Sequence, residues 1–114
     1  WLRLKKSFPL NLNGMYIPQC CFKTGYYKNS GALAITICRR TTLGVLPVVP
    51  LTINLGPMKN HCAAVRDITS PDNKLTKQMQ RIGLVKKKLT TITLGYTSYP
   101  ICEIDEQTLT KYAA

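Results

Sequence analysis

Apolar and polar residues alternate in three separate segments of this chain. Residues 33–37 place leucine and two isoleucines at every second position, and the same period returns at residues 51–55 and 92–94. A period of two is that of a half-buried β-strand, whose successive side chains point to opposite faces of the sheet. Glycines and prolines separate the segments. The sequence therefore predicts several short strands, arranged in a small β-barrel or a β-rich α+β domain.

One segment has a different period. Between residues 70 and 83, Leu75 and Met79 fall at helical spacing, Ser70 can cap the start and Gly83 can close the end. The sequence therefore predicts one short amphipathic helix in an otherwise β-rich chain.

The charge of the chain is one-sided. It carries 16 Lys and Arg against five Asp and Glu, for a net charge of +11, and residues 1–66 contain no acidic residue at all. Charge of one sign repels itself unless a polyanion compensates it. Nucleic acid is therefore the favoured partner, ahead of a membrane surface, a glycosaminoglycan or charge that serves only solubility.

The residue pattern does not support catalysis, metal binding or membrane insertion. His61 is the one histidine, and neither a nucleophile motif nor a glycine-rich phosphate loop is present. The five cysteines lack a Cys-x-x-Cys pair, so they are expected to be buried free thiols rather than zinc ligands. The longest apolar run, residues 43–51, is interrupted by two prolines and is too short for a transmembrane helix. We therefore predict a chain that is not an enzyme, holds no metal or cofactor and has no membrane partner.

Composition divides the chain into three parts. Residues 1–22 contain prolines, asparagines and a glycine that interrupt every period, so we interpret them as an extended basic arm. Residues 103–114 are polar and locally acidic, and we interpret them as a surface tail. Residues 23–102 are then the β-barrel-like, RNA-binding domain.

Basic and aromatic residues in turns and at strand ends are the candidate RNA contacts. Lysine and arginine can neutralise phosphates, asparagine can hydrogen-bond sugar or phosphate, and tyrosine can stack on bases. The competing interpretation is that one tyrosine packs in the core and that the lysines are only solvated. The candidate residues are Lys5, Lys6, Lys23, Tyr26, Tyr27, Lys28, Asn29, Arg39, Arg40, Lys59, Asn60, Arg66, Lys86, Lys87 and Lys88.

Residues 23–37, KTGYYKNSGALAITI, and residues 44–65, GVLPVVPLTINLGPMKNHCAAV, carry a family resemblance. The first is similar to the Lys-Ser/Thr-Gly-Gly-Arg-Asn stretch that leads into the first barrel strand of the universal large-subunit ribosomal protein two family. The second is similar to the strand, turn and strand that follow in the N-terminal RNA-binding domain of that family. The chain departs from the family at residues 38–44, CRRTTLG, which keep basic charge but lack the glycines and histidines of the family's loop, and residues 67–114 match poorly.

The resemblance implies an oligonucleotide-binding-type barrel embedded in ribosomal RNA. It implies a non-catalytic structural constituent of the large subunit, and the divergence suits a mitochondrial ribosome. Its expected partners are rRNA and neighbouring ribosomal proteins, among them a separate chain that would carry the missing second domain.

A second hypothesis belongs to a different class of protein. Cys20 and Cys21, followed by Cys38 and Cys62, are similar to the cysteine pattern of basic CC chemokines. The short first segment between cysteines and the fifth cysteine do not fit that family. The alternative is therefore a secreted, disulfide-stabilised basic ligand, which would contain disulfide bridges instead of free thiols.

Overall fold

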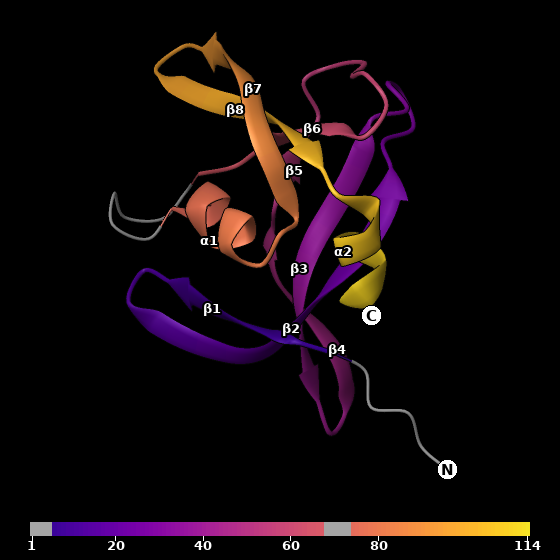
Figure 1. Cartoon of the computed structure of the whole chain (residues 1–114), viewed down its shortest axis with the longest axis vertical. Coiled ribbons are helices and arrows are strands. Elements are labelled where there is room, and N and C mark those ends of the chain that lie inside the picture. The colour runs from indigo at the N-terminus through magenta and orange to yellow at the C-terminus, as the bar shows by residue number, and fades with distance from the viewer. Residues whose placement is uncertain (1–5, 68–73) are drawn as a thin grey trace.

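The computed structural model describes residues 6–67 and 74–114, so the candidate contact Lys5 and the predicted cap Ser70 lie outside the described residues. The described chain forms two antiparallel sheets and two short helices (Figure 1). Sheet A has the strand order β1-β2-β3-β4 and sheet B the order β5-β6-β8-β7. The elements are β1 (Phe8–Leu12), β2 (Met15–Tyr26), β3 (Leu33–Thr41), β4 (Gly44–Pro50), β5 (Thr52–Ile53), β6 (Cys62–Val65), α1 (Leu75–Arg81), β7 (Val85–Leu94), β8 (Thr97–Ile104) and α2 (Glu106–Lys111). The prediction of a mainly β fold is confirmed.

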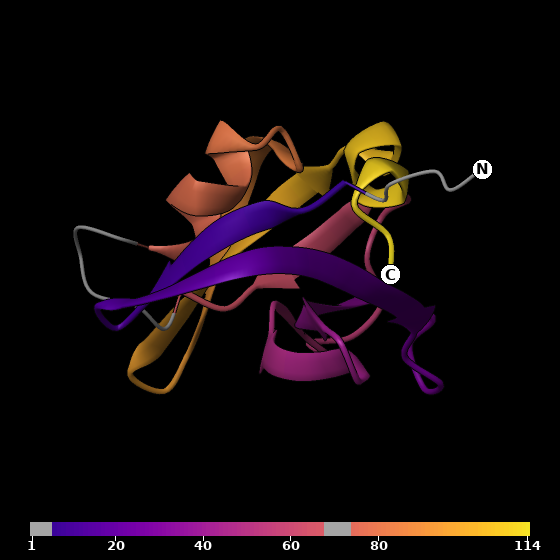
Figure 2. The ribbon, with the colours of Figure 1, turned by 90° about the horizontal axis from the view of Figure 1, so that it is seen from below.

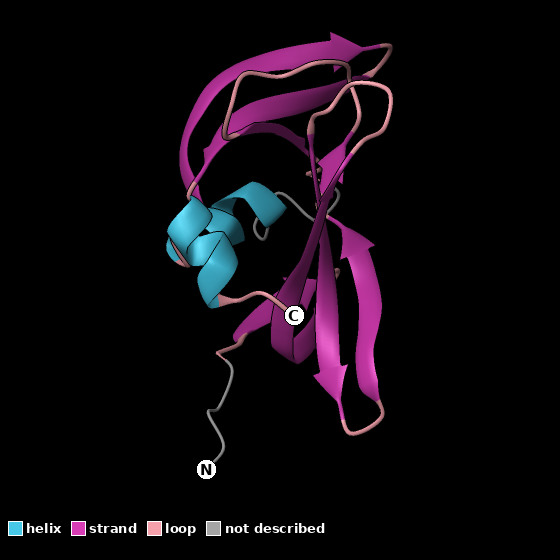
Figure 3. Cartoon of the chain, turned by 90° about the vertical axis from the view of Figure 1, so that its right-hand side faces the viewer, coloured by secondary structure: helices cyan, strands magenta, loops and turns pink. Residues whose placement is uncertain are grey.

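One main hydrophobic core joins the two sheets to α1. Ile35 and Ile37 of β3 are at most 2% exposed, as the alternation in residues 33–37 predicts, and they belong to the same cluster as Leu75 and Met79 of α1. Both helices lie on the same side of the sheets, as Figure 2 and Figure 3 show. The helix predicted between residues 70 and 83 is thus confirmed over the seven residues of α1.

The first turn of α1 is capped by a residue that precedes it in the chain. Asp67 Oδ1 accepts hydrogen bonds from the N–H of Thr76 at 2.9 Å and from its hydroxyl at 2.8 Å. The first N–H groups of a helix have no partner within the helix, so a carboxylate there is stabilising. This contact ties α1 to the segment that follows β6.

The interpretation of residues 1–22 as an extended arm is wrong for the described part, which is a β-hairpin. Asn13 and Gly14 take φ values of 51° and 82° and connect β1 to β2. Asn-Gly is the preferred pair for a two-residue hairpin turn because both positions need positive φ. Asn13 and Gly14, which interrupt the alternation of apolar and polar residues in the sequence, therefore form the turn of the hairpin.

The hairpin β1–β2 also supplies part of the core. A register shift between Phe8 and Leu10 places an extra residue in β2, where Gln19 has a φ of 58°. A bulge of this kind lets a strand continue past a proline such as Pro18. Phe8, Leu10 and Phe22 are at most 2% exposed.

The interpretation of residues 103–114 as a tail is also wrong, although α2 lies at the surface and none of its residues is buried. Ile104 ends β8 with 1% exposure, and Asp105 caps α2 by accepting a hydrogen bond from the Thr108 N–H at 3.1 Å. After α2, the chain pairs with Phe22 of β2 in a parallel bridge. The apolar and aromatic surface of the N-terminal hairpin therefore holds the C-terminal segment in place.

Neither sheet closes into a barrel among the described residues, because each has two unpaired edge strands. The sheets are connected at Leu51, whose N–H donates to the carbonyl of Ile35 and whose carbonyl accepts from the N–H of Arg66. No helix in the described ranges is long and apolar enough to cross a membrane.

Candidate nucleic-acid interface

The basic, aromatic turn between β2 and β3 is fixed to the segment that follows β5. Within the turn, the Gly31 N–H donates to the carbonyl of Tyr27 at 2.7 Å. Ser30 Oγ donates to Asn54 Oδ1 at 2.7 Å, and the Tyr27 hydroxyl lies 3.0 Å from the hydroxyl of Thr52. Thr52 is 3% exposed and also accepts a hydrogen bond from the Ile35 N–H. The turn is therefore held by a partly buried contact between Tyr27 and Thr52 and by an exposed hydrogen bond between Ser30 and Asn54.

A second loop, residues 54–61, carries Lys59 and lies beside this turn. The loop ends in a turn, in which the Cys62 N–H donates to the carbonyl of Lys59 and His61 has a φ of 65°. The carbonyl of His61 accepts from the Ile104 N–H at 2.6 Å, which attaches the loop to β8. A histidine in the left-handed region is uncommon and requires support from its surroundings. These contacts leave Lys59 and Asn60 exposed at the tip of the loop.

The two loops meet at a cavity of about 180 Å³, which we call the loop cavity. Tyr26 and Gly31 line it from the first turn, and Met58, Lys59 and Asn60 line it from the second loop. Candidate contacts that lie more than thirty residues apart in the sequence are therefore brought together.

The two tyrosines of the turn have different environments. Tyr26 is 73% exposed at the loop cavity, so one face of its ring is free to stack. Tyr27 is half-buried and its hydroxyl is paired with Thr52. The competing interpretation of a packed tyrosine is met in part by the half-buried Tyr27, and stacking by Tyr26 stays a prediction.

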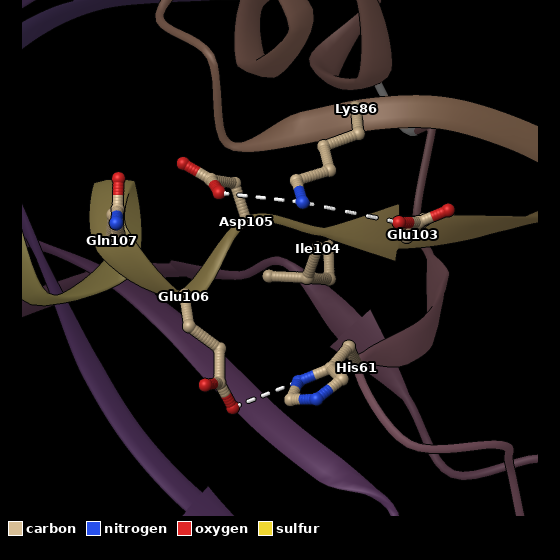
Figure 4. Close-up of a pocket in the computed structure, with 7 residues that line it drawn as sticks. All are labelled: His61, Lys86, Glu103, Ile104, Asp105, Glu106 and Gln107. Atoms are coloured by element: carbon tan, nitrogen blue, oxygen red, sulfur yellow. Dashed lines mark ion pairs between the residues drawn. The ribbon is translucent and has the colours of Figure 1, made fainter.

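An ionic cluster adjoins the loop cavity on the side of α2. His61 Nδ1 lies 2.8 Å from Glu106 Oε1, and these two residues line both the loop cavity and a neighbouring cavity of about 350 Å³ (Figure 4). In this second cavity, Lys86 Nζ lies 3.9 Å from Glu103 and 3.7 Å from Asp105. Lys86 thus has carboxylate partners within the chain, unlike the other candidate lysines that the structure describes.

The carboxyl group of Asp105 titrates at lower pH than usual. The Thr108 hydroxyl donates to it at 2.6 Å, and this hydrogen bond, with the nearby Lys86 ammonium, lowers the pKa of Asp105. The lowered pKa keeps Asp105 ionised to lower pH than an ordinary aspartate, and its carboxylate caps α2 while it pairs with Lys86.

The remaining candidates are spread over other surfaces. Arg39 is exposed at the far end of β3, about 20 Å from the turn at 3.3 Å per residue, and Arg40 donates to the Ala113 carbonyl at 2.7 Å. Arg40 thus contacts the C-terminal segment. Lys6, Lys23, Lys28 and Asn29 are exposed in or near sheet A, Lys87 and Lys88 are exposed on β7, and Arg66 is half-buried after β6.

Several residues of the interface are not among the sequence candidates. Ser30 and Asn54 position the turn, and Met58 and Glu106 line the loop cavity. Ser-Gly at residues 30–31 signals a turn, but no local pattern indicates which segment holds it. Asp105 followed by Glu106 is a helix-start signal that could have located α2 and hence Glu106.

All five cysteines are free and buried. Burial raises the pKa of the Cys20 and Cys102 thiols to about 11 and also raises the pKa of Cys38. Thiols with raised pKa values are poor nucleophiles and metal ligands at neutral pH. In the part of the chain that the structure describes, no three His, Cys, Asp or Glu side chains form a potential metal site.

Comparisons with protein-family models, with curated proteins and with solved structures found no match for this chain.

Proposed function

We propose that this chain is a non-catalytic RNA-binding protein and a structural constituent of the large subunit of a mitochondrial ribosome. One observation carries the RNA-binding part: the Tyr26 turn and the Lys59 loop are joined through Ser30 and Asn54 around one cavity. An exposed tyrosine beside an exposed lysine and an exposed asparagine, here Tyr26 with Lys59 and Asn60, is a combination that can bind unpaired nucleotides.

The net charge of +11 supports the same proposal over the whole surface. Lys23, Lys28 and Lys59 are exposed, and no ion pair among the described residues involves them. Each can release counterions from a phosphate backbone, and this release is a large part of protein–RNA affinity.

The place in the ribosome rests on the resemblance of residues 23–37 and 44–65 to the ribosomal protein two family. In this proposal the two sheets are an opened form of the oligonucleotide-binding-type barrel. They are connected at Leu51, which is hydrogen-bonded to Ile35 of β3 on one side and to Arg66, after β6, on the other. Contacts with rRNA and with neighbouring ribosomal proteins would then complete the exposed surfaces.

RNA binding is tested by fluorescence anisotropy with a labelled single-stranded RNA over a series of salt concentrations. The triple variant Lys23→Gln, Lys28→Gln and Lys59→Gln should lower the affinity and reduce the slope of log K against log salt by about 2, at roughly 0.7 per phosphate contact. The control, Lys74→Gln with Lys77→Gln, changes exposed lysines next to and within α1. Effects in proportion to the number of lysines replaced, three against two, would contradict a localised interface.

The ribosomal assignment is tested by co-sedimentation of the chain with ribosomal particles before and after nuclease treatment. Association that disappears with the RNA supports it. Thiol titration of the denatured chain distinguishes the ribosomal proposal from the secreted-ligand alternative. Five free thiols would agree with the free cysteines of the structure, whereas two disulfide bridges would favour a secreted ligand.

A further inference from the structure

Strand β7 is an edge strand with one unoccupied side. It lies at the end of sheet B and pairs with β8, and no other described strand pairs with it. Its first part is protected, because register shifts occur between Val85 and Lys87 and between Lys88 and Thr90, and lysines occupy this part. Residues 90–94 have a regular register, and their sequence is TTITL, without charge. The open edge is therefore confined to these five residues.

The turn after β7 determines which backbone groups face outward. Gly95 has a φ of 59° and, with Tyr96, forms a two-residue connection between the partners Leu94 and Thr97. Such a turn closes on a hydrogen-bonded pair, and hydrogen-bonded pairs then alternate with unbonded pairs along the ladder. Thr91 and Thr93 therefore direct their N–H and C=O groups away from β8, toward the open side.

An apolar groove lies over one face of sheet B, between β7, β8 and the 54–61 loop. A cavity of about 350 Å³ is lined by Leu89, Thr90 and Ile92 of β7, by Ile101 of β8 and by residues of the 54–61 loop, including Leu55 and Met58. Leu89 is 45% exposed. Ile101 belongs to a second, small hydrophobic cluster, separate from the main core. A strand added to β7 would place every second side chain on the face of sheet B that carries this groove.

The charge around the groove indicates what kind of partner segment can bind there. Lys59 lines the groove, Lys87 and Lys88 precede the open edge, and no acidic residue lines it. A second copy would bring another net charge of +11 to this surface. Charge complementarity therefore favours an acidic partner over self-association.

We propose that residues 90–94 of β7 accept an extended segment of a partner protein as an additional antiparallel or parallel strand, with apolar side chains in the groove and acidic side chains toward the lysines. Backbone hydrogen bonds from Thr91 and Thr93 would provide affinity, and the groove and lysines would provide specificity. Met58 and Lys59 line both the groove and the loop cavity, so the two proposed interfaces adjoin. Leu89 and Thr91 do not line the loop cavity, so their variants test this proposal apart from RNA binding.

The test uses a labelled, acetylated nine-residue peptide in which valine alternates with glutamate, titrated with the full chain by fluorescence anisotropy. Thr91→Pro removes an outward N–H but no bond to β8, and the side chain of Thr91 lies on the face opposite the groove. It should weaken peptide binding about tenfold or more, whereas Thr91→Val should not. Retention of wild-type affinity by Thr91→Pro would overturn the proposal.

A second pair of variants does not touch the backbone. Leu89→Glu places a carboxylate in the groove and should weaken the peptide about tenfold, whereas Leu43→Glu, at a residue 95% exposed in the β3–β4 hairpin, should have no effect. Binding of a valine–lysine peptide as tight as that of the valine–glutamate peptide would contradict the acidic chemistry. If Thr91→Pro lowered RNA affinity as much as peptide affinity, residues 90–94 would be assigned to RNA binding. If the chain formed a homodimer that depended on Thr91 and did not bind the peptide, these residues would be assigned to a second copy of the chain. Either result would overturn the proposal.

Discussion

At the scale of single residues, Tyr26 and Tyr27 are neighbours with different environments. Tyr26 is 73% exposed at the loop cavity, whereas the Tyr27 hydroxyl is 3.0 Å from that of Thr52. Tyr26 is the last residue of β2, whereas Tyr27 begins the turn, where its hydroxyl pairs with Thr52, so two identical side chains meet different surroundings. One residue is available for a ligand because the other holds the turn.

This difference predicts opposite effects of two substitutions. Tyr26→Ala should lower RNA affinity by about 1–3 kcal/mol, the value of one stacked base, with little change in stability. Tyr27→Phe removes the hydroxyl that pairs with Thr52 and should lower the free energy of unfolding by about 1 kcal/mol with little change in RNA affinity. Anisotropy titrations and urea unfolding of both variants measure the two quantities. If Tyr27→Phe lowered RNA affinity and Tyr26→Ala did not, Tyr27 and not Tyr26 would be the RNA contact.

The buried thiols predict a loss of stability at alkaline pH. Burial raises the pKa of Cys20 and Cys102 from 9.0 to about 11, so the folded state prefers the protonated thiols. Their contribution to stability is complete below pH 9, and it is lost as the pH rises from 9 to 11, because the unfolded chain then releases protons first. The urea midpoint should therefore fall between pH 8 and pH 10.5. In the double variant Cys20→Ala and Cys102→Ala, the midpoint should be lower at pH 8 but should fall less with pH.

At the scale of elements, the C-terminal segment completes the N-terminal hairpin. The Tyr112 ring lies 5.2 Å from that of Phe8 and 6.3 Å from that of Phe22, measured between centroids. The Phe22 N–H donates to the Tyr112 carbonyl, and the Ala114 N–H donates to the Phe22 carbonyl. Two ends of the chain that we expected to be extended or solvated therefore stabilise each other.

Tyr112→Ala should thus destabilise the whole domain and not only its end. We expect a loss of about 2–4 kcal/mol in the free energy of unfolding, because an aromatic side chain leaves a packed cluster. Thr110→Ala, at an exposed residue of α2, is the control and should change stability by less than about 0.5 kcal/mol. Urea unfolding followed by circular dichroism measures both. A Tyr112→Ala variant as stable as the control would mean that the cluster contributes little.

At the scale of the whole molecule, unbalanced charge connects stability to a partner. A chain with a net charge of +11 repels itself when compact, and a polyanion that binds only the folded state removes part of that repulsion. In our proposal, the free chain is therefore less stable than the RNA-bound chain.

A single-stranded RNA at about 100 times its Kd should stabilise the folded chain by about 2.7 kcal/mol and raise its Tm, and this increase should diminish as salt is added. Thermal unfolding with and without the RNA, at low and high salt, measures the effect. Neutral dextran at the same mass concentration is the control. An increase in Tm that does not depend on salt would contradict electrostatic binding.

Much of the β framework could be predicted because periodicity is a local property. The alternation through Ile35 and Ile37 and the helical spacing of Leu75 and Met79 both correspond to elements with those faces buried. The hairpin turn at residues 13–14 was also encoded locally, by an Asn-Gly pair that our interpretation treated only as an interruption.

Tertiary structure alone decided which distant segments meet. Asn54 accepts a hydrogen bond from Ser30 in the turn, and Phe22 pairs with the segment after α2. In sheet B, β8 lies between β6 and β7, which leaves β7 at the edge of the sheet. None of these pairings leaves a trace in local periodicity, because strands and loops far apart in the chain are selected by the surface that they bury together. The charge and the strands of this protein are thus properties of its sequence, whereas its loop cavity and its open edge are properties of its packing.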